Sequence, residues 1–165
     1  MKAVNKDLLE HLLNSQIKAV KLYLEKNKEL PPSVATVLFE DGNIRHLPIM
    51  TNDLEVKEKC AVMLRAVASL PYVDAISILL NGWFIRRVAE ETTLPSDMER
   101  PSLATDKKSC IVFSIQTRTG SKNIMYEEKE VDGKKILEEN EEFSKGAPAI
   151  LGRFSNLFLT EKDLN

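Results

Sequence analysis

Residues 73–88 read Val-Asp-Ala-Ile-Ser-Ile-Leu-Leu-Asn-Gly-Trp-Phe-Ile-Arg-Arg-Val, and this stretch decides the fold. Its first half is rich in Ile and Leu, which is typical of a central strand of a sheet. Gly82 and Trp83, the only tryptophan, then interrupt the apolar run, and Arg86 and Arg87 follow. We predict the other elements of the chain as partners of this strand.

Two amphipathic helices are expected before the central strand. The first runs from about Lys6 to Asn27 with Asn5 as its N-cap, because apolar residues recur at helical spacing after a residue that favours the cap. The second runs from about Asp53 to Ser69, with Thr51 or Asn52 as its cap. The apolar faces of the two helices are predicted to consist of Leu9, Leu12, Leu13, Ile17, Val20 and Leu24, and of Leu54, Ala61, Leu64, Val67 and Ala68.

Short apolar runs separated by turn signals predict the remaining strands. Asp41-Gly42 and Asp132-Gly133 are dipeptides typical of tight hairpin turns. The predicted strands are Val34 to Phe39, Asn43 to Leu47, Cys110 to Thr117, Asn123 to Glu130 and Lys135 to Leu137. The order helix, hairpin, helix and then a run of strands indicates a single α+β domain over residues 1–165. We expect an antiparallel or mixed sheet of about five to six strands with two helices packed on one face.

Length, charge and hydropathy exclude several classes of protein. A chain of 165 residues is large enough to bury a proper core as one domain. Its formal net charge of −2 gives no overall basic field that would attract nucleic acid or anionic lipid. No apolar run approaches the roughly 18 residues that a membrane span needs, and no signal peptide is recognisable at the N-terminus. We therefore expect a cytoplasmic protein without membrane contact.

Motifs for common catalytic chemistry are missing from the sequence. Neither His11 nor His46 has a second His or Cys at metal-ligand spacing. Cys60 and Cys110 are too few and too far apart for a disulfide framework, and both are expected to be reduced and buried. A Cys110–His46 dyad is disfavoured because burial in an apolar strand raises the pKa of a thiol. We expect no metal and no cofactor.

One acidic pattern leaves a catalytic alternative open. Glu127 and Lys129 form a Glu-x-Lys pattern on a predicted strand, and Asp74 is an upstream acid on another. A metal-dependent hydrolase or nuclease uses such acids to hold a metal that generates hydroxide. The other interpretation is an edge strand with a solvated, charged face.

The residues around the single tryptophan form the candidate binding site. An aromatic ring beside basic side chains can stack on a base or hold an anion, and the polar connection from Thr92 to Lys108 is long enough to contribute to a site. The other interpretation is a core tryptophan at the point where its strand reaches solvent. The candidate binding residues are Trp83, Arg86, Arg87, Lys107 and Lys108.

One part of the chain combines a strand that ends in tryptophan, a Pro-Ser loop and a charged step before an apolar strand. These pieces are Leu79 to Trp83, Pro95-Ser96, Asp106-Lys107-Lys108 and Cys110 to Ile115. With them, about a quarter of the chain resembles a family of small, uncharacterised prokaryotic and phage proteins. The usual His-Pro of the loop is missing, and Met98 to Pro101 takes its place. The resemblance implies a phage or other mobile-element origin and assigns no catalytic residue.

Together these patterns favour a non-enzymatic binding or accessory module over an enzyme. The expected partner is another protein or a second copy of the chain, and the net charge gives no support to nucleic acid. The alternative is the metal-dependent hydrolase or nuclease with acidic residues on the sheet.

Overall fold

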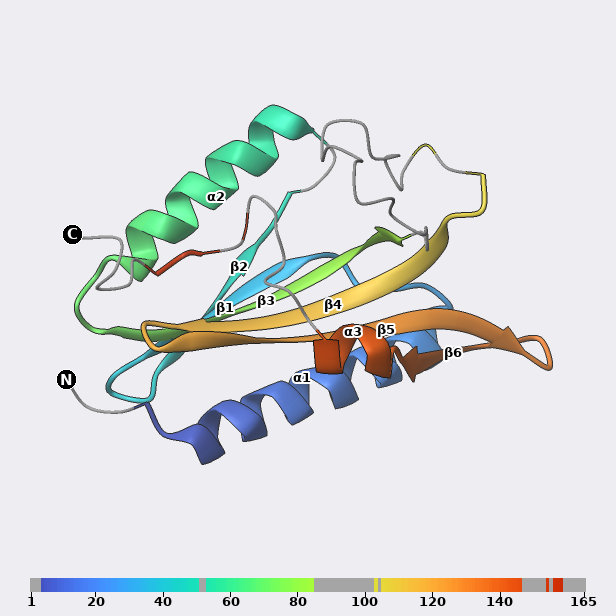
Figure 1. Ribbon diagram of the computed structural model, residues 1–165, viewed down its shortest axis with the longest axis horizontal. Helices are drawn as coiled ribbons and strands as arrows, with labels where there is room; N and C mark the ends of the chain where they lie inside the picture. The colour runs from blue at the N-terminus through green and yellow to red at the C-terminus, as the bar shows by residue number, and fades with distance from the viewer. Residues whose placement is uncertain are drawn as a thin grey trace.

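Six antiparallel strands form one sheet in the order β2-β1-β3-β4-β5-β6 (Figure 1). The computed structural model describes residues 4–50, 53–84, 103, 105–146, 154 and 156–158. The prediction of an α+β protein with an antiparallel sheet is confirmed. The strands are β1 (Val34–Phe39), β2 (Ile44–Pro48), β3 (Val73–Phe84), β4 (Lys108–Thr117), β5 (Gly120–Val131) and β6 (Lys134–Glu139).

Side-chain caps set where the helices begin. The Asn5 side chain accepts hydrogen bonds from the first backbone N–H groups of α1 (Lys6–Asn27), as predicted. Asp53 does the same for α2 (Leu54–Ala68), whereas the predicted caps Thr51 and Asn52 lie outside the described residues. A third helix that the sequence did not predict, α3 (Glu141–Gly146), follows β6. None of the described helices combines the length and the hydropathy that crossing a membrane requires.

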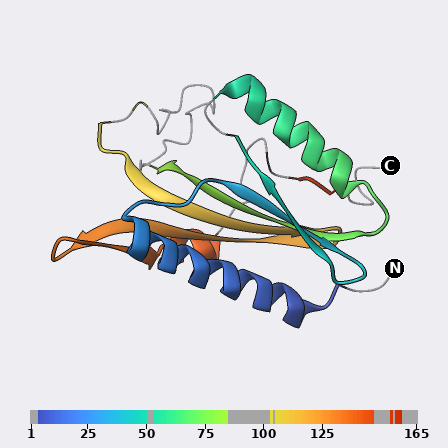
Figure 2. The same ribbon diagram turned by 180° about the vertical axis from the view of Figure 1, so that it is seen from behind.

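The two long helices cover opposite faces of the sheet, so the prediction that both pack on one face is wrong (Figures 1 and 2). One apolar cluster joins α2 to even-numbered positions of β3, and it contains Ala61, Leu64, Ala68, Ile76 and Ile78. The other joins α1 to an odd-numbered position of β3 and to β4, and it contains Leu13, Val20, Leu79, Ile111 and Phe113. Below, the two sides of the sheet are called the α2 face and the α1 face.

The alternation of side chains along β3 explains this arrangement. Successive residues of a strand point to opposite faces, so a strand that is apolar at both parities needs cover on both sides. Ile76 and Ile78 are fully buried on one side, and Leu79 is 5% exposed on the other. One helix cannot shield both sets of side chains, and the second face therefore receives the second helix.

A small polar network lies within the α1 face. The Ser77 hydroxyl donates to Gln16 Oε1 at 2.6 Å, and Gln16 Nε2 donates to Thr36 Oγ1 at 3.1 Å. Thr36 Oγ1 also lies 3.0 Å from His46 Nδ1. Ser77 and Thr36 are each 1% exposed, so the Gln16 amide satisfies hydroxyls that would otherwise be costly to bury. The network fixes α1 against β1 and β3.

The α2 helix provides a direct test of the buried stripe. Leu64 is fully buried, whereas Leu54, which we expected in the same stripe, is 60% exposed at the first position of the helix. Leu64→Ala should lower the free energy of unfolding by about 2–5 kcal/mol, because it leaves a cavity between α2 and the sheet. Leu54→Ala should change it by no more than about 0.5 kcal/mol. Urea unfolding of both variants measures the difference, and equal effects would contradict this packing.

Candidate functional site

Trp83 lies near the end of β3 with about half of its surface in solvent. Its exposed fraction is 49%, which excludes the interpretation as a core tryptophan. The pairing of β3 with β4 continues without a shift through Gly82↔Cys110, Trp83↔Ser109 and Phe84↔Lys108, so Gly82 does not mark a bulge. Trp83 therefore keeps the parity of Leu79 and lies on the α1 face.

Trp83 is exposed because β3 extends beyond its neighbour β1. The pairing of these two strands ends at Val34↔Leu79. Beyond that point, hydrogen bonds that involve side chains take the place of the backbone ladder. The Asn81 N–H donates to Ser33 Oγ at 3.2 Å, and Asn81 Nδ2 donates to the carbonyl oxygen of Pro31 at 2.6 Å. In the part of the chain that the structure describes, the last residues of β3 have only β4 as a neighbouring strand.

The backbone of Trp83 points toward this open edge. Along a strand the N–H and C=O groups of successive residues point alternately to the two neighbouring strands. The Asn81 N–H points to the β1 side, where Ser33 accepts it. The N–H and C=O groups of Trp83, two residues further on, consequently point to the same side, and no described strand lies there.

Lys107 lies over the exposed ring of Trp83. Its Nζ is 4.6 Å from the ring centroid, which is the geometry of a cation–π contact worth about 0.5–1 kcal/mol at an exposed site. Lys108 lies opposite Phe84, one position further along, and therefore on the α2 face. The structure thus brings Trp83 and Lys107 together and places Lys108 on the other side of the strand pair.

The remaining predicted site residues cannot be placed. Arg86 and Arg87 lie outside the described residues, and so does most of the connection from Thr92 to Lys108. Their contribution to a site around Trp83 stays a prediction.

A hollow of about 670 Å³ opens beside Trp83. Its apolar lining includes Leu30, Leu80 and Val112. Its charged lining carries both signs and consists of Glu29, Lys57, Glu128 and Lys135. These residues come from β3, β4, β5 and β6, from α2 and from the segment after α1. The tertiary fold brings them together, so no local sequence motif could have identified them.

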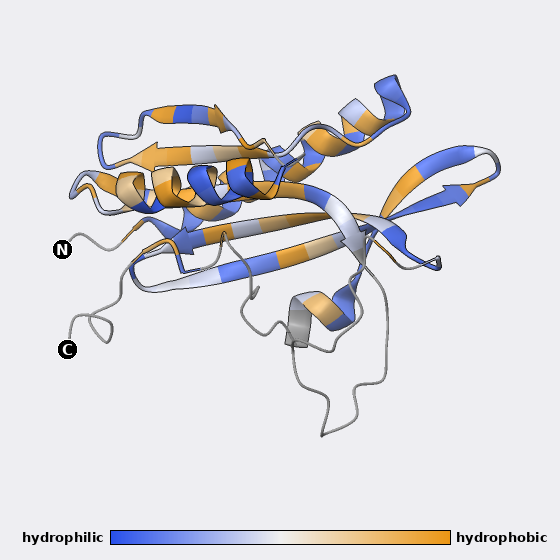
Figure 3. Cartoon of the chain, turned by 90° about the horizontal axis from the view of Figure 1, so that it is seen from above, coloured by the Kyte–Doolittle hydropathy of each residue, from blue (hydrophilic) through white to orange (hydrophobic). Residues whose placement is uncertain are grey.

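The sheet divides at this end, and the hollow is lined by both parts. The pairing of β4 with β5 stops at Cys110↔Glu127, whereas β5 continues to Val131 with β6 as its partner. Figure 1 shows β4 curving away from the projecting hairpin of β5 and β6, and Figure 3 shows that this hairpin is largely hydrophilic. Ser109 and Glu128, the next residues of the two strands, both line the hollow.

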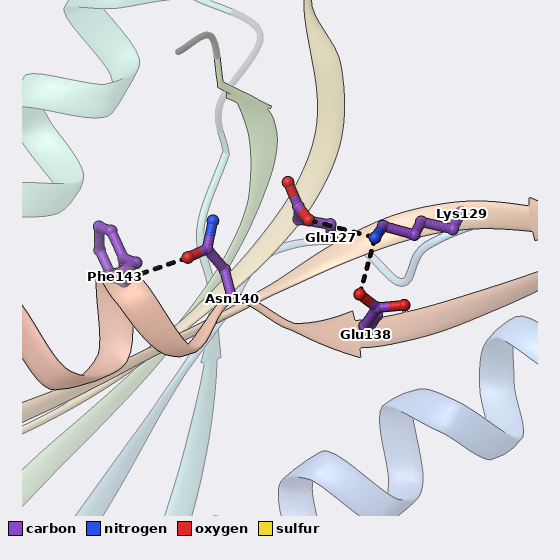
Figure 4. A network of polar contacts seen from close by, with 5 residues as sticks. All are labelled: Glu127, Lys129, Glu138, Asn140 and Phe143. Carbon is purple, nitrogen blue, oxygen red and sulfur yellow. Dashed lines mark hydrogen bonds and ion pairs between the residues drawn. The ribbon is translucent and has the colours of Figure 1, made fainter.

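Ion pairs stabilise the base of the projecting hairpin (Figure 4). Lys129 Nζ lies 2.7 Å from Glu138 Oε1 and 3.8 Å from Glu127 Oε2. The hydrogen bond to Glu138 raises the pKa of Lys129, and the charge of Glu127 adds to this effect. Lys129 therefore stays protonated and acts as the central cation between two carboxylates.

The three residues of the hydrolase alternative do not converge. Glu127 lies opposite Cys110, which lies opposite Gly82, whereas Asp74 is eight residues earlier on β3. At about 3.3 Å per residue, Asp74 is roughly 26 Å away along the sheet. The described residues also contain no group of three His, Cys, Asp or Glu side chains that could hold a metal ion.

Cys110 is a buried thiol that lies far from His46. Burial raises its pKa from 9.0 to about 12, with a smaller contribution from the Glu127 carboxylate. His46 belongs to β2, three strands away in the sheet, and contacts Thr36 on the α1 face, whereas Cys110 pairs with Gly82 on the α2 face. The Cys110–His46 dyad is therefore not formed.

Comparison with known proteins gives no relative. No family model, no curated protein and no solved structure matches the chain. The resemblance noted in the sequence stays a prediction.

Alkylation of Cys110 tests its environment. In a Cys60→Ser variant, iodoacetamide at pH 8 should modify native Cys110 about 1,000-fold more slowly than the urea-unfolded chain, because the thiolate is the reactive form and the pKa difference is about three units. Glu127→Gln should speed the native reaction, since it removes the carboxylate that helps to raise the pKa. Native labelling as fast as in urea would contradict the burial.

The raised pKa of Cys110 also predicts that the stability of the protein depends on pH. Between about pH 9 and pH 12 the unfolded chain loses the Cys110 proton while the folded chain keeps it. The contribution of this group to the free energy of unfolding therefore falls as the pH rises across that window. Cys110→Ala should weaken the dependence.

Proposed function

We propose that the protein is a non-enzymatic binding module and that its contact surface is the end of the sheet around Trp83. The observation that carries this proposal is a half-exposed tryptophan, at 49%, beside a hollow of about 670 Å³ with a mixed apolar and charged lining. The partner is proposed to be another protein.

The chemistry of the surface supports a protein partner. Tryptophan is enriched among the residues that dominate protein interfaces, because one rigid side chain buries a large area. The ring of Trp83 has Lys107 on it, and its backbone N–H and C=O point to an open edge. Apolar, cationic and hydrogen-bonding groups are therefore available within a small area.

The charges around the hollow favour a protein over a nucleic acid. A phosphate backbone is bound by an accumulation of Lys and Arg side chains. Here two basic residues, Lys57 and Lys135, line the hollow together with two acidic residues, Glu29 and Glu128. Lys135 Nζ lies 3.7 Å from Glu128 Oε1 as an ion pair. A mixed polar surface of this kind suits the polar rim of a protein interface.

Gly82 allows the hollow to be filled without disturbing the strand. A Cβ built at this position meets no atom within 4 Å, and Gly82 lines the hollow. Valine also favours a strand. Gly82→Val should therefore preserve the fold while its side chain occupies part of the contact surface.

The test is affinity capture from the native host with four forms of the full chain: wild type, Trp83→Ala, Gly82→Val and the control Leu54→Ala, which removes an exposed apolar side chain from α2. A specific partner should be recovered with the wild type and with Leu54→Ala, and its recovery should fall at least tenfold with the other two. Equal recovery with all four would contradict the proposal. A rise in the urea midpoint on adding Mg²⁺, Mn²⁺ or Zn²⁺ would also contradict it, because it would show a metal bound to the native state.

A further inference from the structure

Three apolar residues near the C-terminal end of the described chain pack on the α2 face of the sheet. Phe154, Leu157 and Phe158 belong to the apolar cluster of the α2 face and are 9%, 2% and 4% exposed. The nearest described residue before them is Gly146, at the end of α3. The described residues of this segment belong to no helix or strand of the sheet.

Gln116 of β4, a buried side chain, makes hydrogen bonds to two of the described residues of this segment. Gln116 is 5% exposed; its Nε2 donates to the carbonyl oxygen of Phe154 at 2.6 Å, and its Oε1 accepts from the Leu157 N–H at 3.0 Å. Asn156, which precedes Leu157, has a φ of 51°, in the left-handed region. The Gln116 side chain therefore forms one donated and one accepted hydrogen bond with the backbone of the segment, as a neighbouring strand would.

Arg118 completes the site at the end of α2. Its guanidinium donates to the carbonyl oxygens of Ala68, at 3.3 Å, and Leu70, at 2.8 Å, which fixes its position. It lies 5.4 Å from the ring centroid of Phe158, at cation–π distance. Gln116 thus contacts backbone groups of the segment, and Arg118 contacts its aromatic ring Phe158.

We infer that the α2 face beside Gln116 and Arg118 is a recognition site for a Phe-x-x-Leu-Phe segment and that Phe154, Leu157 and Phe158 occupy it as parts of an exchangeable internal ligand. Among the described residues, the side-chain hydrogen bonds from the sheet to this segment come from the Gln116 amide, whereas the strands around it are held by continuous ladders. A segment held in this way opens locally at a lower free energy than the core strands. A peptide with the same three apolar side chains and the same turn fits the vacated site.

The test uses two reagents. One is a labelled synthetic peptide with the sequence of residues 152–160. The other is the full chain with both Leu157→Ala and Phe158→Ala, which is called the tail variant. Fluorescence anisotropy should show peptide binding to the tail variant at least tenfold tighter than to the wild type, because the wild-type segment competes at a high effective concentration. Adding Gln116→Leu to the tail variant should weaken binding at least tenfold. Trp83→Ala should leave it unchanged, because Trp83 lies on the α1 face whereas the segment packs on the α2 face.

Two results would overturn the inference. A tail variant that unfolds cooperatively but binds no peptide shows that the segment is not replaceable, and binding that survives Gln116→Leu shows that the site is not the one described. If the tail variant does not fold, hydrogen exchange of the wild type decides. The Leu157 amide should exchange faster than the ladder amides of β4, and exchange as slow as theirs would exclude local opening.

Discussion

The burial of β3 on both of its faces is the constraint on which the rest of the structure depends. Ile76 and Ile78 pack under α2, and Leu79 packs under α1. Two helices on opposite faces are the consequence, because each covers only one parity of side chains. The need to cover both faces also accounts for the C-terminal segment, whose aromatic rings shield part of the α2 face. On the α1 face, Gln16 accepts a hydrogen bond from the buried hydroxyl of Ser77.

The candidate site arises where this constraint ends. The pairing of β3 with β1 ends at Val34↔Leu79, and the helices cover the middle of the sheet. The last residues of β3 therefore leave the core while they are still paired with β4. Trp83 continues the odd parity of Leu79 but has no helical cover comparable with that of Leu79, and 49% of its surface remains exposed. A rigid strand thus presents the ring at a fixed position, which reduces the conformational entropy lost when a partner binds.

Local signals in the sequence predicted the elements well and their arrangement only in part. Asn5 and the Asp-Gly turns fixed the start of α1 and the hairpins, because caps and turns depend on neighbouring residues. The helices lie on opposite faces because β3 is apolar at both odd and even positions. The unbroken apolar run from Ile78 to Leu80 indicated burial on both faces. Trp83 could be identified from the sequence because it is the only tryptophan and is followed by two arginines. The roles of Glu128 and Gln116 depend on contacts with residues distant in sequence, and no local motif reveals such contacts.

Alanine substitutions at three positions of β3 test this account most directly. Ile78 and Leu79 are adjacent but face different helices, so Ile78→Ala and Leu79→Ala should each lower the free energy of unfolding by about 2–5 kcal/mol in urea. Trp83→Ala, at the exposed end of the same strand, should change it by no more than about 1 kcal/mol. A loss below about 1 kcal/mol at either Ile78 or Leu79, or a loss at Trp83 equal to theirs, would contradict a strand that is buried on both faces and emerges as a binding surface at its end.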